Sequence, residues 1–232
     1  MRCVLIIGGN SDIGISLANY FISKDYNVVI GYHNDNNKYI DSVKYIKCDV
    51  TDTDSIEKII LDTKNMYGNI DIIINLACIS MDNSFLNKTK EEFMKVLEVN
   101  LVGTFLCNQI YSRYIDDGLI INIASTDGVD TYSEYSIDYS ASKSGVINIS
   151  KSVSLCTKNK ILCIAPNWID SNSTRCMNKE YLESELKRIK QDRLITMDEF
   201  ILGFDKIINS KFNSGDIFRI DIKDGELWVE KI

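Results

Sequence analysis

Tyr139 and Lys143 stand four positions apart in Tyr139-Ser140-Ala141-Ser142-Lys143, a spacing that places two side chains on one helix face, about one turn apart. A tyrosine with its ordinary pKa of about 10 is a poor acid or base at neutral pH. A nearby ammonium group stabilises the phenolate and lowers that pKa. We therefore expect this pair to transfer protons, although the spacing alone often occurs by chance.

A glycine-rich turn follows the first strand-like run of the chain. Val4 to Ile7 lead into Gly8-Gly9-Asn10-Ser11-Asp12-Ile13-Gly14, and a helical pattern begins at once. Glycine permits close backbone approach to a ligand, and free amides at a helix start attract a pyrophosphate. The position of the turn in a βαβ unit predicts a dinucleotide site, with a purely structural turn as the alternative. The expected contacts are Gly8, Asn10, Ser11, Asp12, Ile13 and Gly14.

The end of the second strand bears on the choice of dinucleotide. An acidic residue about 20 positions after the glycine turn would bind the adenosine ribose of NAD. Here Gly31-Tyr32-His33-Asn34 occupies that stretch and Asp35 comes slightly later, so NADP(H) is weakly favoured over NAD(H). His33 is a candidate contact for the 2′-phosphate, or else a solvated loop residue. Asp49-Val50, after the third strand, is suited to placing a carboxylate near adenine, or Asp49 caps the next helix.

These residues need a scaffold of alternating strands and helices. Short β-branched runs alternate with longer segments of helical spacing, which predicts repeated βαβ units and a doubly wound parallel sheet, the Rossmann fold, in one α/β domain spanning residues 1–232. The expected strands are Cys3–Ile7, Asn27–Tyr32, Tyr45–Cys48, Ile70–Asn75, Leu119–Ala124 and Ile161–Ala165. The expected helices are Ile13–Lys24, Asp54–Met66, Lys90–Tyr114, Ile137–Cys156, Lys179–Lys190 and Met197–Ile208.

The tail of the chain has a different pattern. Residues alternate between apolar and polar from Asp216 to Ile222, Asp224-Gly225 is typical of a tight turn, and Leu227 to Val229 resumes an apolar run. We expect a terminal β-hairpin.

Composition and charge exclude several classes of protein. The single histidine, His33, and seven cysteines without a CxxC pair argue against a metal site and against a histidine-dependent hydrolase. A net charge of −7 argues against general nucleic-acid binding. The longest apolar runs are far shorter than the ~20 residues of a membrane span, and no signal-peptide pattern is present, so we expect a cytoplasmic protein with no membrane contact.

Taken in order, the motifs of the chain resemble those of the short-chain dehydrogenase/reductase superfamily over essentially the whole length. The family's TGxxxGxG motif matches Ile7 through Gly14, with Asp12 in place of the middle glycine. Its NNAG motif matches Asn75-Leu76-Ala77-Cys78, which keeps the asparagine and the alanine and loses the last glycine. The resemblance places Asn75 and Ala77 beside the cofactor.

The same resemblance assigns roles to residues near the Tyr139 motif. Asn100 matches a helix asparagine that holds a water of the proton relay, or else is a helix-packing amide. Ser125 matches the strand-end serine that binds the substrate carbonyl, with Thr126 as the alternative by one residue of register. Pro166-Asn167 resembles the family's PG motif, and the backbone of Ile169 would meet the nicotinamide amide.

The resemblance implies an NAD(P)(H)-dependent oxidoreductase that interconverts a ketone and a secondary alcohol by hydride transfer. Ser125, Tyr139, Lys143 and Asn100 would be its catalytic residues, with Tyr139 and Lys143 also binding the cofactor. The closest likeness is to 3-oxoacyl-acyl-carrier-protein reductases, so the substrate could be a thioester of acyl carrier protein or CoA. Between Arg175 and Arg193 six basic and four acidic residues make a stretch that suits such a partner, or an ordinary solvated face.

Two further expectations concern assembly and the alternative class. The resemblance and the long apolar-striped helices predict a homo-oligomer, either a dimer or a tetramer. The altered glycines keep open a non-catalytic NAD(P)-binding sensor or scaffold of the same fold. Retention of Ser125, Tyr139, Lys143 and Asn100 together favours the enzyme, since a scaffold has no chemical need for the complete set.

Overall fold

A computed structural model describes residues 2–35 and 39–232 of the chain. Within those residues eight strands form one sheet in the order β3-β2-β1-β4-β5-β6-β7-β8. All neighbouring pairs are parallel except β7 and β8, which form an antiparallel hairpin at one edge. The strands are β1 Cys3–Ile7, β2 Asn27–Tyr32, β3 Lys44–Lys47, β4 Ile72–Asn75, β5 Leu119–Ile123, β6 Lys160–Pro166, β7 Asp216–Lys223 and β8 Glu226–Lys231.

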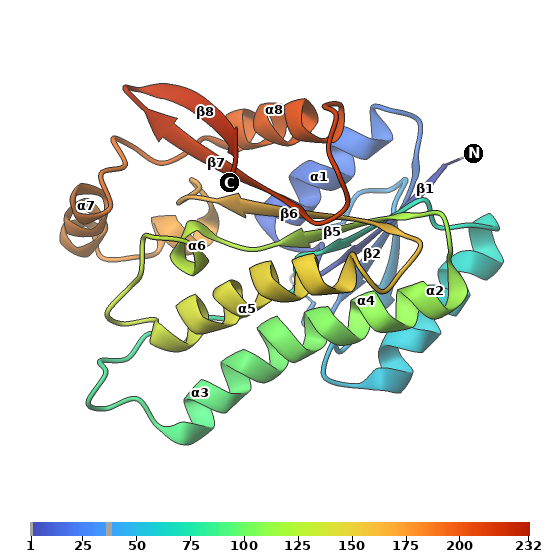
Figure 1. Cartoon of the computed structure of the whole chain (residues 1–232), viewed down its shortest axis with the longest axis horizontal. Helices are drawn as coiled ribbons and strands as arrows, with labels where there is room; N and C mark the ends of the chain where they lie inside the picture. Colours follow the sequence, from blue (N-terminus) through green and yellow to red (C-terminus); the bar gives the residue numbers. More distant parts are fainter. Residues whose placement is uncertain (1, 36–38) are drawn as a thin grey trace.

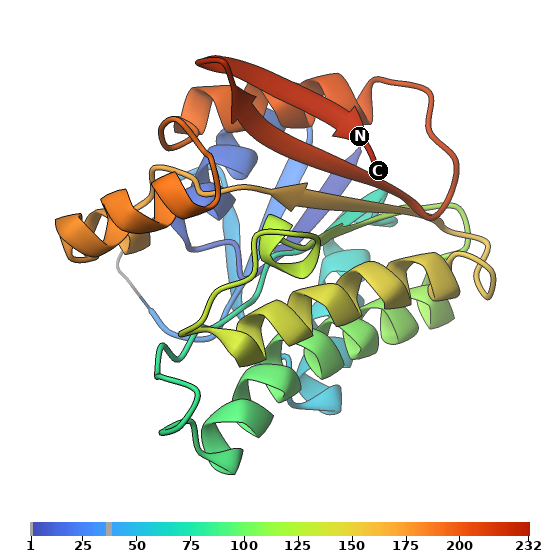
Figure 2. The ribbon, with the colours of Figure 1, turned by 60° about the vertical axis from the view of Figure 1, so that its left-hand side comes forward.

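Helices cover both faces of the sheet (Figures 1 and 2). They are α1 Asp12–Ile22, α2 Thr53–Tyr67, α3 Lys90–Leu97, α4 Gly103–Tyr114, α5 Ile137–Val153, α6 Asn172–Arg175, α7 Lys179–Arg188 and α8 Met197–Ile208. Val4 and Ile6 of β1 pack with the core side chains of α1 and α8, whereas Leu5 and Ile7 pack with those of α2 and α4. Because both faces are covered, the central strands are apolar throughout rather than alternating.

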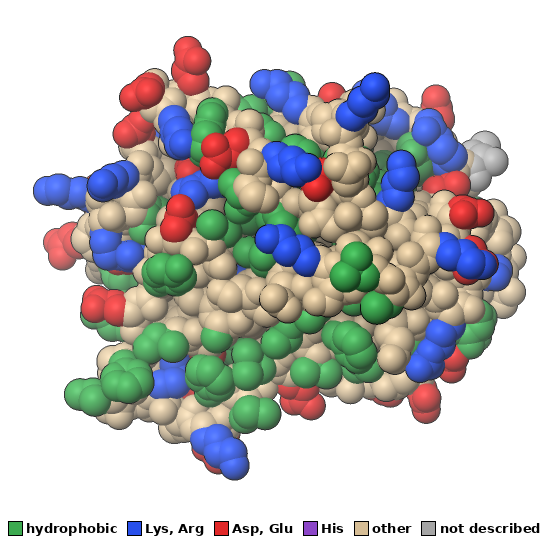
Figure 3. All heavy atoms as spheres, viewed as in Figure 1, with side chains coloured by type: hydrophobic (Ala, Val, Ile, Leu, Met, Phe, Trp, Pro, Cys, Tyr) green, Lys and Arg blue, Asp and Glu red, His purple; other side chains and the backbone are tan. Residues whose placement is uncertain are grey.

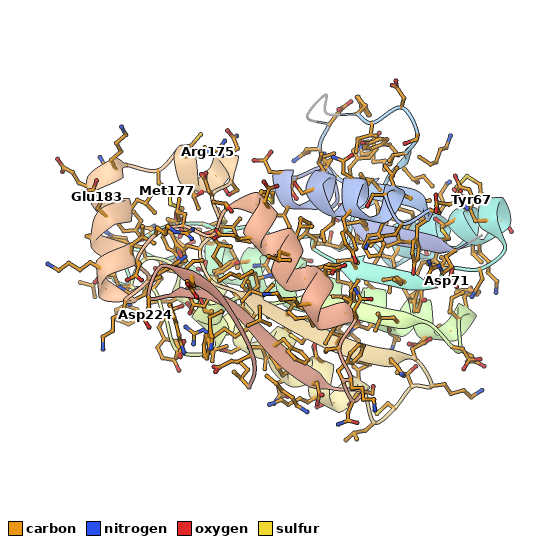
Figure 4. The ribbon with its side chains drawn as sticks, turned by 90° about the horizontal axis from the view of Figure 1, so that it is seen from above. Tyr67, Asp71, Arg175, Met177, Glu183 and Asp224 are labelled. Carbon is orange, nitrogen blue, oxygen red and sulfur yellow. The ribbon has the colours of Figure 1, made fainter. Side chains whose placement is uncertain are left out.

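The strand order changes direction between β1 and β4. The chain runs outward from β1 through β2 to β3 and then crosses back to place β4 on the other side of β1. In sheets of this kind the carboxyl ends of the strands at such a point leave a crevice in which ligands bind. Figure 4 shows Glu183 of α7 at one end of the molecule, with Met177 between α6 and α7 close to it, and Tyr67 and Asp71 toward the other end.

The predicted α/β doubly wound fold is confirmed, including the C-terminal hairpin. Differences are local. β4 begins at Ile72 rather than Ile70, and α5 ends at Val153 rather than Cys156. The short helix α6 was not predicted, because four residues carry too little periodicity to be recognised.

The predicted helix Lys90–Tyr114 contains an interruption. Its α-helical turns are separated by a π-helical segment, Glu98–Val102, so that α3, this segment and α4 follow one another without a break in the helical path. A π-helical turn inserts one residue into an α-helix and occurs often at functional sites. Asn100 lies at the centre of this segment.

No helix within residues 2–35 and 39–232 is long and apolar enough to span a bilayer.

Candidate active site

The glycine turn is held tightly between the ends of β2 and β4. The backbone amides of Gly8 and Gly9 both donate to the carbonyl of Gly31, at 2.8 and 3.1 Å. Gly8 has a φ of +80°, and a Cβ there would lie 2.5 Å from the amide nitrogen of Ala77. Only glycine therefore fits at position 8, and Ala77 lies directly against the turn as its neighbour.

The first turn of α1 begins where the glycine turn ends. Ser11 is its N-cap, and its hydroxyl accepts a hydrogen bond from the Gly14 amide at 3.2 Å. The Asp12 carboxylate accepts a bond from the backbone amide of Asn172 at 2.6 Å, which ties the turn to α6. The side-chain amide of Asn10 donates to the backbone carbonyl of Asn34 and so joins the turn to the loop after β2. The predicted residues Asn10, Ser11 and Asp12 thus fix the shape of this loop.

A cavity of about 320 Å³ opens beside the start of α1. Residues from the carboxyl ends of β4, β5 and β6 and from α5 line it together. Among those predicted as site residues, the cavity wall includes Ile13, Ser125, Tyr139, Lys143, Pro166 and Ile169. Residues as far apart in the chain as Ile13 and Ile169 therefore meet around one space.

Lys143 is held firmly in this wall. Its side chain is 3% exposed, and its ammonium donates to the carbonyl of Ile123 at 2.8 Å. The ammonium lies 5.5 Å from the centre of the Tyr139 ring, as one turn of α5 requires. Tyr139 and Lys143 therefore share one helix face, as their spacing predicted.

The pKa of Tyr139 differs from the sequence-based expectation. We expected the Lys143 ammonium to lower it, but burial of the phenol, with Cys78 and Asp127 nearby, raises the pKa well above its ordinary value. A hydrogen bond with the Ser125 side chain acts in the opposite direction without cancelling this effect. Tyr139 therefore lies beside Ser125 in surroundings that favour the protonated form of its phenol.

Ser125, rather than Thr126, is the hydroxyl that meets Tyr139. Ser125 lines the cavity and caps the 3-10 turn Thr126–Gly128, where its side chain accepts a bond from the Asp127 amide at 3.1 Å. The Thr126 hydroxyl is fully buried and donates to the Asn167 side chain at 3.0 Å. The geometry thus selects between the two registers left open by the sequence.

Asn100 connects the loop after β4 with α5. Its amide oxygen accepts from the Ile79 backbone at 2.8 Å, and its amide nitrogen donates to the Ile79 carbonyl at 2.9 Å and to Ser142 at 3.1 Å. Both N–H groups are therefore used by protein atoms. Only the remaining lone pair of its oxygen could serve a water of a proton relay.

The adenosine end predicted from sequence comes together at the surface. His33 Nε2 lies 3.4 Å from Asp49 Oδ2, and both side chains are more than one-third exposed. Hydrogen bonds from the backbone and side chain of Thr51 lower the pKa of Asp49, with a smaller contribution from His33. Val50 is buried against Gly103 of α4, so it supports this end from beneath.

Asn75 lies beneath the site rather than in the cavity wall. Its amide nitrogen donates to Asn108 on α4 and to Asn122 on β5, both at 2.8 Å. Asn122 in turn donates to Ser150 of α5 at 2.9 Å. This buried network joins two strands to the helices packed on them.

Sequence reasoning missed an ion pair beside Tyr139. Lys88, just before α3, pairs with Asp138 at 3.0 Å, and both side chains are almost fully buried. Asp138 immediately precedes Tyr139 at the start of α5, and its carboxylate also accepts a bond from the Tyr139 amide. The acidic residue in a helix first turn was visible in the sequence. Its partner, 50 positions earlier, was not.

The fold and this cavity define an α/β protein with a dinucleotide-type glycine turn and a serine–tyrosine–lysine group at the crevice beside it. Comparison with known proteins agrees. The family model for short chain dehydrogenases matches residues 2–182, and the chain belongs to this family. It is an NAD(P)-dependent oxidoreductase of that family.

Three proteins illustrate the similarity. The 3-oxoacyl-[acyl-carrier-protein] reductase MabA of Mycobacterium avium is 28% identical over 204 residues, covering 85% of this chain and 79% of that protein. A short chain dehydrogenase from Leptospira borgpetersenii, solved with bound NAD⁺, is 26% identical with a TM-score of 0.83, covering 95% and 91% of the two chains. A structure of ElxO with bound NADP has a TM-score of 0.77 at 24% identity and covers 94% and 96%.

The residues present fit a nicotinamide dinucleotide. The glycine turn ends at the positive end of α1, and a Cβ at Gly14 would lie 2.3 Å from the Gly9 carbonyl, so the turn keeps its tight shape. Asp12 is the one acidic departure, and its carboxylate is engaged by the Asn172 amide.

Proposed function

We propose that the chain interconverts a ketone and a secondary alcohol, with Ser125, Tyr139 and Lys143 as the groups that act on substrate and cofactor. The observation that supports this most is the meeting of Ser125, Tyr139 and Lys143 in one cavity beside the glycine turn. A bound nicotinamide ring would donate or accept the hydride.

Each side chain has a distinct task in this proposal. The Ser125 hydroxyl polarises the carbonyl oxygen, and the Tyr139 phenol donates a proton to the oxygen as negative charge develops there. Lys143, freed from the Ile123 carbonyl, holds the ribose of the cofactor. Asn100 positions Ile79 and Ser142, and through them the loop after β4 and α5. Pro166 and Ile169 close the nicotinamide side of the cavity.

We propose that NADP(H) is preferred over NAD(H). No carboxylate stands at the end of β2, where Tyr32 is followed by His33. The His33 side chain is 60% exposed and so accessible to a 2′-phosphate, to which an imidazole N–H can donate. The neighbouring Asp49 charge opposes a phosphate, which keeps the preference weak.

We also propose that the chain acts as one domain and assembles with copies of itself as a dimer or tetramer. The groove between α4 and α5 has a volume of about 460 Å³ and includes Phe105, Ile149 and Val153 in its lining. Phe105 and Val102 are at least 40% exposed. Figure 3 shows hydrophobic side chains gathered over the lower face, where α3, α4 and α5 lie in Figure 1. An apolar surface of this kind is typical of a subunit interface.

The first substrate class to test is a 3-oxoacyl thioester of acyl carrier protein or CoA, because curated relatives carry that name. The competing proposal, a sensor or scaffold that binds NAD(P) without turnover, is not favoured, since the complete Ser125, Tyr139 and Lys143 set lines one cavity.

A screen of ketones and alcohols with NADP(H) and NAD(H), followed by absorbance of the reduced nicotinamide, tests the proposal. We expect turnover of at least one substrate, lost in Tyr139→Phe. Cofactor binding without turnover of any ketone or alcohol would instead support the sensor.

A further inference from the structure

The cavity beside Tyr139 carries a group of polar side chains that the hydride-transfer proposal does not use. We call Asp82, Asp127, Ser133 and Ser136 the polar wall; all four line the cavity. They come from the loop after β4, the 3-10 turn after β5 and the loop before α5. Their chemistry bears on the substrate, because they lie beyond the groups assigned to the carbonyl.

Asp127 is the buried carboxylate of the polar wall. Asp127 lies two positions after Ser125 and is 6% exposed. Its Oδ1 accepts a hydrogen bond from the Thr131 hydroxyl at 2.8 Å. Burial raises its pKa, while the bond from Thr131 and the charge of Arg188 act to lower it. Asp127 also raises the pKa of Tyr139 by its charge, so the two groups lie close together.

Asp82 is held in place by two hydroxyls. Ser80 donates to its Oδ1 at 2.6 Å, and Ser136 donates to the same atom at 2.5 Å. Both of these bonds end on one oxygen, so Oδ2 can accept further donors. Tyr181 of α7 also lines the cavity. Burial is the main cause that raises its pKa, the charge of Asp82 adds to this, and a hydrogen bond with the Ser133 side chain acts to lower it.

Positive charge is scarce around the polar wall. Among the described residues that line the cavity, Lys143 alone is cationic, and it donates to Ile123 and is assigned to the cofactor. Arg188, which lies near Asp127, is bound to Glu185 and to the Thr131 carbonyl. An anionic substrate would therefore face the like charges of Asp82 and Asp127 with no free cation beside it, which disfavours its binding.

The basic segment from Arg175 to Arg193 does not change this balance. Its three arginines each pair with a carboxylate of the chain: Arg175 with Asp170, Arg188 with Glu185 and Arg193 with Glu199. The arginines are thus neutralised by their own neighbours. The segment therefore offers the phosphates of CoA or of a phosphopantetheine carrier less positive charge than its composition suggested.

Aromatic surfaces complete the lining. Trp168 and Tyr181 both line the cavity, and the Tyr181 ring packs edge-to-face on Tyr135 at 5.7 Å between ring centres. An aromatic face beside hydroxyls and carboxylates suits a ligand with C–H groups on one side and hydroxyls on the other. A sugar or a polyol has that form.

From the polar wall and its aromatic neighbours we infer that the substrate is an uncharged polyhydroxylated carbonyl compound or the polyol derived from it, with its hydroxyls donating to Asp82 and Asp127. The inference rests on the proposed ketone and alcohol chemistry of the same site. It replaces the thioester as the expected substrate class, and it assigns Asp82 and Asp127 to substrate specificity rather than to proton transfer.

The test compares three kinds of substrate on the purified full-length chain, with both cofactors. The probes are xylitol and sorbitol as polyols, acetoacetyl-CoA as an anionic thioester, and cyclohexanol as an uncharged alcohol with one hydroxyl. We expect a polyol to have a kcat/KM at least tenfold above that of acetoacetyl-CoA. Asp127→Asn and Asp82→Asn should each raise the KM for the polyol about tenfold or more, affect cyclohexanol far less because it has no second hydroxyl, and improve acetoacetyl-CoA.

Asp116→Asn is the matched control, because Asp116 precedes β5 at the opposite end of the sheet and forms an exposed ion pair with Lys158. It should change none of these rates. Retained cofactor affinity in all three variants shows that they fold.

The outcomes separate the two proposals. Preference for acetoacetyl-CoA, or polyol kinetics indifferent to both aspartate variants, overturns the inference and leaves the ketone and alcohol chemistry standing. If no probe is turned over, titration calorimetry of xylitol and sorbitol into the cofactor-saturated protein decides. Binding weakened by Asp127→Asn supports the polyol site while the proposed chemistry fails, and absence of binding heat in the wild type overturns the inference.

Discussion

The side-chain amide of Asn167 donates to Asp221 of β7 at 2.9 Å, and so joins the cavity wall to the C-terminal hairpin. Asn167 occupies the position of a glycine in the family's motif. Its oxygen accepts from the Thr126 hydroxyl at 3.0 Å, next to Ser125. Asp221 also pairs with Arg219, which pairs in turn with Asp130 at 2.7 Å. Asn167 therefore links the C-terminal hairpin to the residue that follows Ser125.

Replacing either member of this bond should destabilise the protein. Asn167→Ala and Asp221→Ala each leave a buried polar partner without its bond, which costs about 1–3 kcal/mol of unfolding free energy. The double variant should lose less than the sum, since the two side chains share one interaction. Urea unfolding of the four proteins measures this coupling. Additive losses would show that the hairpin and the cavity wall are independent.

Tyr139→Phe and Lys143→Ala should differ in their effect on cofactor affinity. Removing the phenolic oxygen should abolish most turnover and leave cofactor affinity nearly unchanged, because a general acid acts on the transition state. Removing the ammonium should weaken both, because Lys143 is assigned to the ribose as well. Fluorescence titration with NADPH and steady-state rates provide the comparison.

Tyr67→Phe is the control for these variants, because Tyr67 lies at the far end of the molecule from Met177 (Figure 4). It should match the wild type. Equal loss of cofactor affinity in Tyr139→Phe and Lys143→Ala would indicate that the Tyr139 hydroxyl is structural.

The two directions of the reaction should depend on pH in different ways. Reduction needs the protonated phenol of Tyr139 and oxidation needs the phenolate. Burial raises the pKa of Tyr139 well above its ordinary value, so the phenol stays protonated through neutral pH and loses its proton only at strongly alkaline pH. We expect a flat kcat/KM for reduction between pH 7 and 9 and a steadily rising kcat/KM for oxidation. An oxidation rate that levels off below pH 8 would contradict this.

Cofactor preference should respond in opposite directions to two substitutions at the adenosine end. His33→Gln removes a potential cation and should weaken NADPH binding about two- to fivefold, the usual size of an exposed charge contact, with little effect on NADH. Asp49→Asn removes a neighbouring negative charge and should strengthen NADPH binding. Titrations with both cofactors at low salt test this. If NADH binds more tightly than NADPH in the wild type, Asp35 or another group supplies the missing ribose contact.

Residues at the ends of strands and along single helix faces could be predicted from the sequence. Tyr139 and Lys143 were found from their spacing, and Ser125 and Ile169 from the family resemblance at two strand ends; all four line the cavity. The pairings of Lys88 with Asp138 and of Asn167 with Asp221 could not. Each joins residues at least 50 positions apart, and which side chains meet depends on how separate elements pack.

The direction of the Tyr139 pKa shift could not be predicted from the sequence either. The sequence shows that Lys143 is one turn away, but it does not show that the ammonium is held by the Ile123 carbonyl or that Asp127 lies nearby. Burial is the largest cause of the raised pKa of Tyr139, and the charges of Cys78 and Asp127 add to it.

The π-helical segment Glu98–Val102 also determines where this long helix can change its length during evolution. A π-helical turn takes up one extra residue, so losing one residue inside the segment would restore a regular α-helix and keep α4 facing the sheet as it does now. Successive residues of a regular α-helix are rotated by about 100°, so losing one residue at the start of α4 would turn the side chains that follow by that angle. Asn108 would then leave its bond to Asn75, and Phe105 would leave the surface groove. A single codon deletion is therefore compatible with this packing inside the segment and disrupts it in α4.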